Sequence, residues 1–259
     1  MTRRALAATL IAAAAATTLA GCGGVGATLT FNDVEKVKIT EIKMVGDSGD
    51  VAVKTAAIAE TRITRIIQHS SDPGPSYKVE GTVLSIDTNC GADCRADYDI
   101  TAPEGVKVTG KLSSGDIGLT AIGSADVTVT SGDILVQGAT GDVRAVATSG
   151  DLNVTQVAGK TTLQSTSGDA RALDVRGPVD VRVTSGDVTV HSRAQNSITA
   201  NATSGNVDVT VPRGGYRINI DANSGDEAMT DLVPDPASKF TLDLHAGSGD
   251  VTLVADPAA

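Results

Sequence analysis

Glycine recurs every nine residues through the middle of this 259-residue chain. It occupies positions 123, 132, 141, 150, 159, 168, 177 and 186 without a slip. Within this run a Ser-Gly-Asp triplet recurs at double that spacing, as Ser131-Gly132-Asp133, Ser149-Gly150-Asp151, Ser167-Gly168-Asp169 and Ser185-Gly186-Asp187. A fixed short period is the signature of a repeat architecture, in which each repeat stacks on its neighbours. The repeating unit is therefore about 18 residues long and consists of two nine-residue halves.

Further copies of the triplet flank the regular run. Two precede it and three follow it with longer spacing, as Ser48-Gly49-Asp50, Ser114-Gly115-Asp116, Ser204-Gly205-Asn206, Ser224-Gly225-Asp226 and Ser248-Gly249-Asp250. We interpret residues 28–106 as less regular N-terminal β coils with a cap, and residues 107–255 as the regular repeat. Pro212, Pro234 and Pro236 predict longer loops in the C-terminal stretch, which we expect to close the other end.

Each nine-residue half carries the pattern of a short strand. Of the sixteen residues that stand two and four positions after these glycines, fifteen are apolar and Thr161 is the exception. The residue between each apolar pair is mostly polar, as with Asp126 and Arg144. Alternation with a period of two predicts a strand with one buried face. We expect the glycine to supply the positive φ of the turn that follows.

A strand this short cannot bury its apolar face alone, so the coils must stack to form a continuous core. Two strands per coil, stacked at the inter-strand spacing of about 4.8 Å, make a two-sided solenoid. The composition fits a narrow interior, because Trp is absent and Phe and Tyr total only five residues. The sequence therefore predicts an all-β fold, a β-solenoid with about 18 residues and two short strands per coil.

The first 27 residues predict export and a lipid anchor. A basic start with Arg3 and Arg4 precedes an uncharged, Ala-rich stretch over residues 5–19, and Leu19-Ala20-Gly21-Cys22 follows. This order resembles a bacterial lipoprotein signal, which implies a signal peptide over residues 1–21 and a lipid on Cys22. An ordinary secretory signal with a chance cysteine is the alternative. The glycines in residues 22–27 predict a flexible tether, and we expect an extracytoplasmic protein held at the cell membrane.

Charge excludes one class of partner. The chain has 21 Lys and Arg against 31 Asp and Glu, and a net charge of −10. Removal of residues 1–21 would take away two arginines and leave a net charge of −12. A general nucleic-acid binder needs a basic face to meet phosphates, so we expect no nucleic-acid partner.

The order of several motifs resembles a known family. The Ser-Gly-Asp copies, residues 98–105 (YDITAPEG) and residues 209–212 (VTVP) together are similar to a bacterial β-strand-repeat family of unknown function whose members are called putative adhesins. The Cys90 and Cys94 pair is a feature of lipoprotein members of that family. The resemblance covers roughly residues 28–255 and implies a β-solenoid. It carries over no catalytic or binding residues.

The aspartates of the triplets are the first candidates for chemistry. Stacked coils would place them in one column, which in the regular part contains Asp116, Asp133, Asp151, Asp169 and Asp187. Like charges 4.8 Å apart repel by about 0.9 kcal/mol in water, and a bound cation would relieve that repulsion. The calcium-binding nonapeptide pattern differs, however, because it has two more glycines per repeat. We therefore favour a structural role over metal binding, in which the Ser and Asp side chains satisfy local backbone groups at the turn.

The two neighbouring cysteines predict a disulfide. Cys90 and Cys94 are close in sequence in a chain predicted to be exported, where disulfides form and persist. A metal site is the alternative, but it needs further ligands, and His69, His191 and His245 are scattered. We expect no cofactor.

Three outward-facing sets complete the candidates. Threonines before the triplets would form a column (Thr130, Thr148, Thr166, Thr184 and Thr203), which fits β propensity better than ice binding. Outward arginines could contact a partner or form a solvated face (Arg144, Arg171, Arg182 and Arg193). His191 should face outward, because Val188 and Val190 face inward. No catalytic constellation emerges from these spacings.

We therefore expect a non-enzymatic surface adhesion or interaction protein. Its partners would be the membrane, through Cys22, and an envelope protein or a cell-wall glycan. A carbohydrate-active β-helix enzyme and a purely structural envelope component are the alternatives. A groove lined by converging carboxylates would favour the enzyme.

Overall fold

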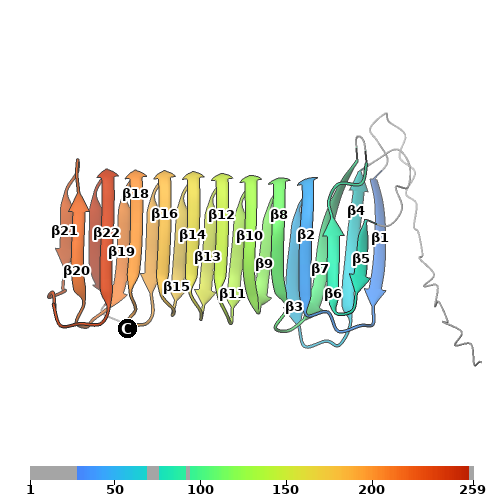
Figure 1. Cartoon of the computed structure of the whole chain (residues 1–259), viewed down its shortest axis with the longest axis horizontal. Coiled ribbons are helices and arrows are strands. Elements are labelled where there is room, and N and C mark those ends of the chain that lie inside the picture. Colours follow the sequence, from blue (N-terminus) through green and yellow to red (C-terminus); the bar gives the residue numbers. More distant parts are fainter. Residues whose placement is uncertain (1–27, 69–75, 92–93, 257–259) are drawn as a thin grey trace, which may run out of the picture.

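The computed structural model describes residues 28–68, 76–91 and 94–256. The predicted signal peptide (residues 1–21), the tether over residues 22–27 with Cys22, and His69 lie outside these residues. The described chain consists of strands and irregular segments, and none of its elements is a helix that could span a membrane. The fold is a long rod of stacked strand pairs (Figure 1), and the prediction of an all-β solenoid is confirmed.

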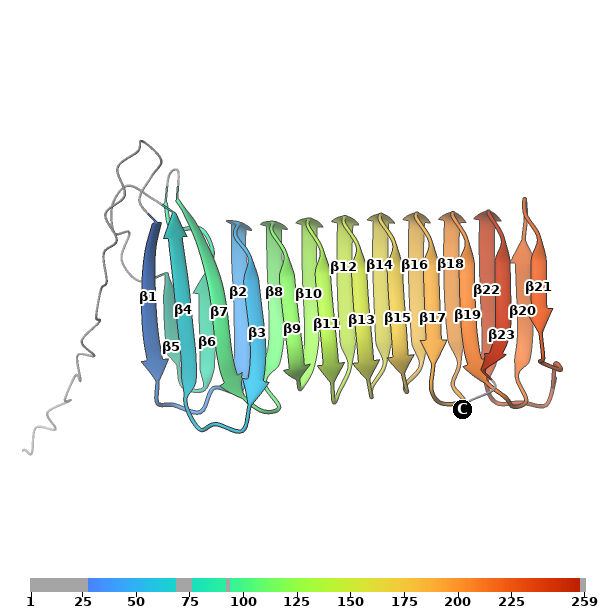
Figure 2. The same ribbon diagram turned by 180° about the vertical axis from the view of Figure 1, so that it is seen from behind.

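The strands form two sheets that face each other along the rod (Figures 1 and 2). Sheet A has twelve strands in the spatial order β1 (Thr28–Glu35), β4 (Thr61–Gln68), β7 (Arg95–Pro103), β3 (Val51–Ala56), β9 (Ile117–Ile122), β11 (Ile134–Ala139), β13 (Leu152–Val157), β15 (Ala170–Val175), β17 (Val188–Ser192), β19 (Val207–Pro212), β23 (Val251–Asp256) and β21 (Glu227–Thr230). Sheet B has eleven strands in the order β20 (Arg217–Ala222), β22 (Thr241–Ser248), β18 (Ile198–Ser204), β16 (Val179–Ser185), β14 (Thr161–Ser167), β12 (Val143–Ser149), β10 (Ser124–Ser131), β8 (Lys107–Ser114), β2 (Glu41–Ser48), β6 (Val83–Asp87) and β5 (Tyr77–Glu80).

Successive coils pair in parallel through the regular part. Val143 of β12, for example, lies between Ala125 of β10 and Thr161 of β14. Each coil contributes one strand to each sheet, and the Ser-Gly-Asp triplet forms the corner between the two strands. All sixteen positions that the alternation assigned to the interior are buried, so the predicted inward faces are confirmed.

The coils at the two ends do not follow chain order. At the N-terminal end, β2 and β3 lie beside β8 and β9, while β6 and β7 form the next coil outward. The antiparallel strands β1, β4 and β5 finish that end. At the other end the last coil of the chain, β22–β23, is inserted between β18–β19 and β20–β21, so a red coil stands between orange ones in Figure 1. The rod therefore ends on β20–β21 and not on the C-terminal strands.

The glycines of the two half-repeats are required for different reasons. Gly150 of the triplet has a φ of 137°, and a Cβ there would lie 2.0 Å from the carbonyl oxygen of Gly132 in the neighbouring coil. Gly177, between triplets, is not among the glycines with positive φ, but a Cβ there would lie 2.1 Å from the oxygen of Gly159. The expectation that every glycine of the period supplies a positive φ is therefore wrong, because half of them are needed only for the close approach of stacked backbones.

Candidate functional site

The triplet aspartates form a hydrogen-bonded ladder along one corner of the rod. The Oδ1 atom of Asp133 accepts a hydrogen bond from the backbone N–H of Asp151 at 2.8 Å, and Oδ1 of Asp151 accepts from Asp169 at 2.9 Å. The same contact joins coil to coil through ten residues, in the order Asp97, Asp50, Asp116, Asp133, Asp151, Asp169, Asp187, Asn206, Asp250 and Asp226.

This ladder corrects the structural role expected for the aspartates. Their partner is the amide of the next coil and not a backbone group of the same turn. Asn206 serves in the same way, because its amide oxygen accepts from the N–H of Asp250 at 2.9 Å. One oxygen of each ladder carboxylate except that of Asp226 is thus already an acceptor. In the described part of the chain, no group of three or more His, Cys, Asp or Glu side chains is placed to hold a metal ion.

The threonine column lies on the outer face of sheet B, beside this ladder. All five threonines are exposed. Four of them line a shallow groove of about 420 Å³, together with Gln164, Arg182 and Asn201 (Thr148, Thr166, Thr184 and Thr203). The groove offers hydroxyl, amide and guanidinium groups to solvent.

The outward arginines are paired with aspartates. Each of the four lies within ion-pair distance of a carboxylate: Arg144 and Asp126 at 3.3 Å, Arg171 and Asp169 at 2.6 Å, Arg182 and Asp180 at 3.2 Å, and Arg193 and Asp174 at 2.8 Å. Exposed pairs of this kind contribute little to stability, about 0–1 kcal/mol each.

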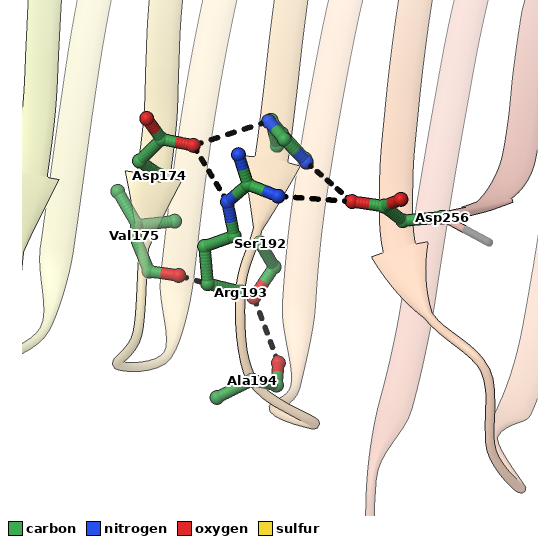
Figure 3. A network of polar contacts seen from close by, with 7 residues as sticks. Asp174, Val175, Ser192, Arg193, Ala194 and Asp256 are labelled. Carbon is green, nitrogen blue, oxygen red and sulfur yellow. Dashed lines mark hydrogen bonds and ion pairs between the residues drawn. The ribbon is translucent and has the colours of Figure 1, made fainter. Parts of the chain in front are cut away.

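His191 lies on the outer face of sheet A, as predicted, between two carboxylates. Figure 3 shows the polar cluster to which it belongs, with Asp174, Arg193 and Asp256 labelled. Nδ1 of His191 lies 3.4 Å from Oδ1 of Asp174, and its Nε2 lies 3.1 Å from Oδ2 of Asp256. Arg193 contacts the same two oxygens, at 2.8 and 3.1 Å. Two carboxylates and two basic groups therefore satisfy one another.

The cluster contains a serine that does not face the histidine. Ser192 is fully buried, and its hydroxyl donates a hydrogen bond to the carbonyl oxygen of Ala194 at 2.8 Å. A nucleophilic serine would need to contact the imidazole that takes its proton. The cluster therefore connects the end of β23 to β15 and β17 through ion pairs, and it does not form a hydrolase triad.

The comparison with protein families identifies the fold. The family model described as Toastrack DUF4097 matches residues 96–253, well over half of the chain. The chain belongs to this family. The chain matches none of the curated proteins compared with it.

Two solved structures are similar to the chain. A crystal structure described as a putative adhesin from Bacteroides fragilis has 15% sequence identity and a TM-score of 0.51, covering 88% of this chain and 97% of that one. A second, described as a putative cell adhesion protein from Clostridium sporogenes, has 12% identity and a TM-score of 0.28, covering 87% of this chain and 99% of that one. The first likeness supports the Toastrack fold of this chain.

The predicted cysteine pair is joined in the structure. Cys90 and Cys94 form a disulfide with their Cα atoms 5.2 Å apart, in the loop between β6 and β7. After this loop, β7 lies between β3 and β4 in sheet A. The disulfide closes a short loop at the N-terminal end of the rod.

Sequence reasoning missed the partners of His191. Asp174 is held with a φ of 56°, a left-handed conformation that recurs once per coil at Ala121, Gly138 and Gln156. Gly138 and Asp174, each three residues before a glycine of the nine-residue period, were the available signal for this recurrent bulge. Asp256 had no such signal, since 65 residues separate it from His191.

Proposed function

We propose that this protein is a lipid-anchored, non-enzymatic adhesion or interaction protein on the extracytoplasmic side of the bacterial cell membrane. The observation that carries the proposal is the rod itself. Its sheets run without interruption from β1 and β5 at one end to β20 and β21 at the other. The eleven strands of sheet B span about 48 Å at the usual inter-strand spacing.

The proposed anchor stands at the right end for display. Strand β1 begins at Thr28, six residues after Cys22, and six extended residues span at most about 20 Å. A lipid on Cys22 would therefore hold the N-terminal end near the bilayer, with the β20–β21 end farthest from it. A rigid spacer of this kind suits a protein that meets a partner beyond its own membrane.

Other observations support an exported, non-enzymatic role. The Cys90–Cys94 disulfide fits an oxidising compartment, and the similar protein from Bacteroides fragilis is described as a putative adhesin. A glycosidase needs two carboxylates that flank a sugar. Asp174 and Asp256 instead each contact both His191 and Arg193, so the cluster offers little support for the carbohydrate-active alternative.

Anchoring is tested by fractionating cells that carry the wild-type chain or Cys22→Ser. We expect wild type to incorporate labelled palmitate and remain with the membrane, and the variant to do neither. Equal membrane retention without label would contradict the anchor.

The same cells, cross-linked in place and analysed by mass spectrometry, should yield a reproducible envelope protein or glycan only when the anchor is intact. A glycan-cleaving activity that one carboxylate substitution abolishes would overturn the non-enzymatic proposal.

A further inference from the structure

The two ends of the rod are finished differently. At the N-terminal end, Arg65 points inward from β4 and is 6% exposed. Its guanidinium lies 4.9 Å from the ring centre of Phe31 and 5.2 Å from that of Tyr77, and it pairs with Asp33 at 3.1 Å. A charged and aromatic plug therefore covers the core at this end.

The β20–β21 end has apolar side chains where the plug would be. Ile218 and Ile220 of β20 alternate with outward polar residues and remain partly exposed. Met229 of β21 is 43% exposed, and Val233 in the loop that follows is 80% exposed. This end face is the apolar terminus of the core and is the part of the rod farthest from residue 28.

The outer edge of β20 has backbone groups that no described residue pairs with. β20 pairs with β22 on one side and is the last strand of sheet B. The N–H of Arg217 donates to Phe240 on the β22 side, so in a parallel ladder the backbone groups of Ile218 and Ile220 point to the other side. That side is already used at both flanks: the N–H of Asp235 donates to the carbonyl of Tyr216, and the N–H of Ala222 donates to Glu227. The unpaired stretch is thus centred on Asn219.

We propose that β20 pairs antiparallel with β20 of a second copy, on a two-fold axis through Asn219. In this register Ile218 lies opposite Ile220 of the second copy, and the backbone groups that point outward on both strands form the hydrogen-bonded pairs. Pro234, which lies beside Tyr216, marks where the pairing stops. The interface is isologous, with one patch used twice.

The charges on β20 are self-complementary in this register. Arg217 and Asp221 both point outward and are exposed, and the two-fold axis places each opposite the other, twice per dimer. Arg217 donates to the carbonyl of Ser238 at 3.0 Å and has no carboxylate partner among the described residues. Asp221 contacts Nδ1 of His245 through one oxygen at 3.1 Å, and its second oxygen remains for the arginine. Opposite charges directly across a strand pair stabilise it.

The dimer joins two rods tail to tail and places their N-terminal ends at opposite extremes. If the chain is anchored as proposed above, on which this consequence rests, the two anchors lie in two different membranes. The partner of the adhesion protein is then a second copy on a facing surface. Copies in one membrane point the same way and cannot form this pair.

A cysteine at the axis tests the geometry in the full chain carrying Cys22→Ser. Cα atoms of a non-hydrogen-bonded antiparallel pair are about 4.5 Å apart, within the range of a disulfide. Asn219→Cys should therefore form a covalent dimer under mild oxidation. Thr162→Cys, in the same outward column of sheet B, is the matched control and should remain monomeric. Equal cross-linking of both variants, or of neither, would overturn the proposal.

Charge exchange tests the register by sedimentation of the same chain. Arg217→Asp and Asp221→Arg should each weaken dimerisation by roughly tenfold, because like charges then face each other. The double exchange should restore it to within about threefold, while Arg144→Asp in the middle of the rod should change nothing. A monomer at all concentrations, or a dimer indifferent to these changes, refutes the pairing. Continued anchor-dependent capture of an envelope protein or glycan would then show that the proposed function survives without it.

Discussion

Substitutions at Asp133 separate the two opposing contributions of the aspartate ladder. Its Oδ1 atom accepts the N–H of Asp151 at 2.8 Å, a contact that contributes about 1 kcal/mol. Its charge faces those of Asp116 and Asp151 one strand away, and each repulsion costs about 0.9 kcal/mol in water before screening. The hydrogen bond and the repulsion are therefore similar in size and opposite in sign.

Asp133→Asn keeps the acceptor and removes the charge, as Asn206 does in the native ladder. Asp133→Ala removes both. At low salt we expect the free energy of unfolding of the Asn variant to exceed that of wild type by about 1–2 kcal/mol. We expect the free energy of unfolding of the Ala variant to lie about 1 kcal/mol below that of the Asn variant. At 1 M salt the Debye length falls to about 3 Å, so Asn should match wild type while Ala falls about 1 kcal/mol below it.

Thermal unfolding at two ionic strengths measures these differences. A change of 1 kcal/mol shifts the Tm by about 2–4 °C in a domain of this size. Asn206→Asp is the converse control and should lower the Tm at low salt only. If the Asn and Ala variants behave alike at both salt concentrations, the side-chain acceptor contributes nothing and the reasoning is refuted.

Other predictions use the same melts. Thr161 is fully buried between Val143 and Val179, and its hydroxyl has no hydrogen-bond partner in the described structure. Thr161→Val should therefore raise the free energy of unfolding by about 1 kcal/mol or more. No gain would mean that the hydroxyl is satisfied. Gly150→Ala should lower the free energy of unfolding by at least about 2 kcal/mol because of its left-handed φ and the neighbouring carbonyl. Gly118→Ala should be tolerated, because an added Cβ there meets nothing within 4 Å. Equal effects would refute the stacking argument. Calcium and chelator should give the same Tm, since the ladder carboxylates already accept coil-to-coil hydrogen bonds, and a rise with calcium would restore the metal hypothesis.

Much of the regular rod could be predicted because stacking joins repeats that are adjacent in sequence. A residue and its counterpart one repeat later occupy equivalent positions, so the alternation around each glycine assigned the buried face correctly at all sixteen positions, Thr161 included. The same period placed the aspartates in one column. It could not show that each carboxylate accepts from the next coil, because that depends on the direction in which the corner backbone points.

The sequence by itself determined the repeat, the inward faces and the resemblance to a β-strand-repeat family, because each of these depends on a local period that the coils repeat. Only the tertiary structure decided what happens where the period fails. In the structure, β22–β23 lies between β18–β19 and β20–β21. The sequence does not predict this order, because any free sheet edge can accept a parallel strand of matching register and no local signal selects one. The tertiary structure also brought Asp256 to His191 and left the backbone of Ile218 and Ile220 at a free edge. Both outcomes depend on the order of the last coils in space and not on their order in the chain.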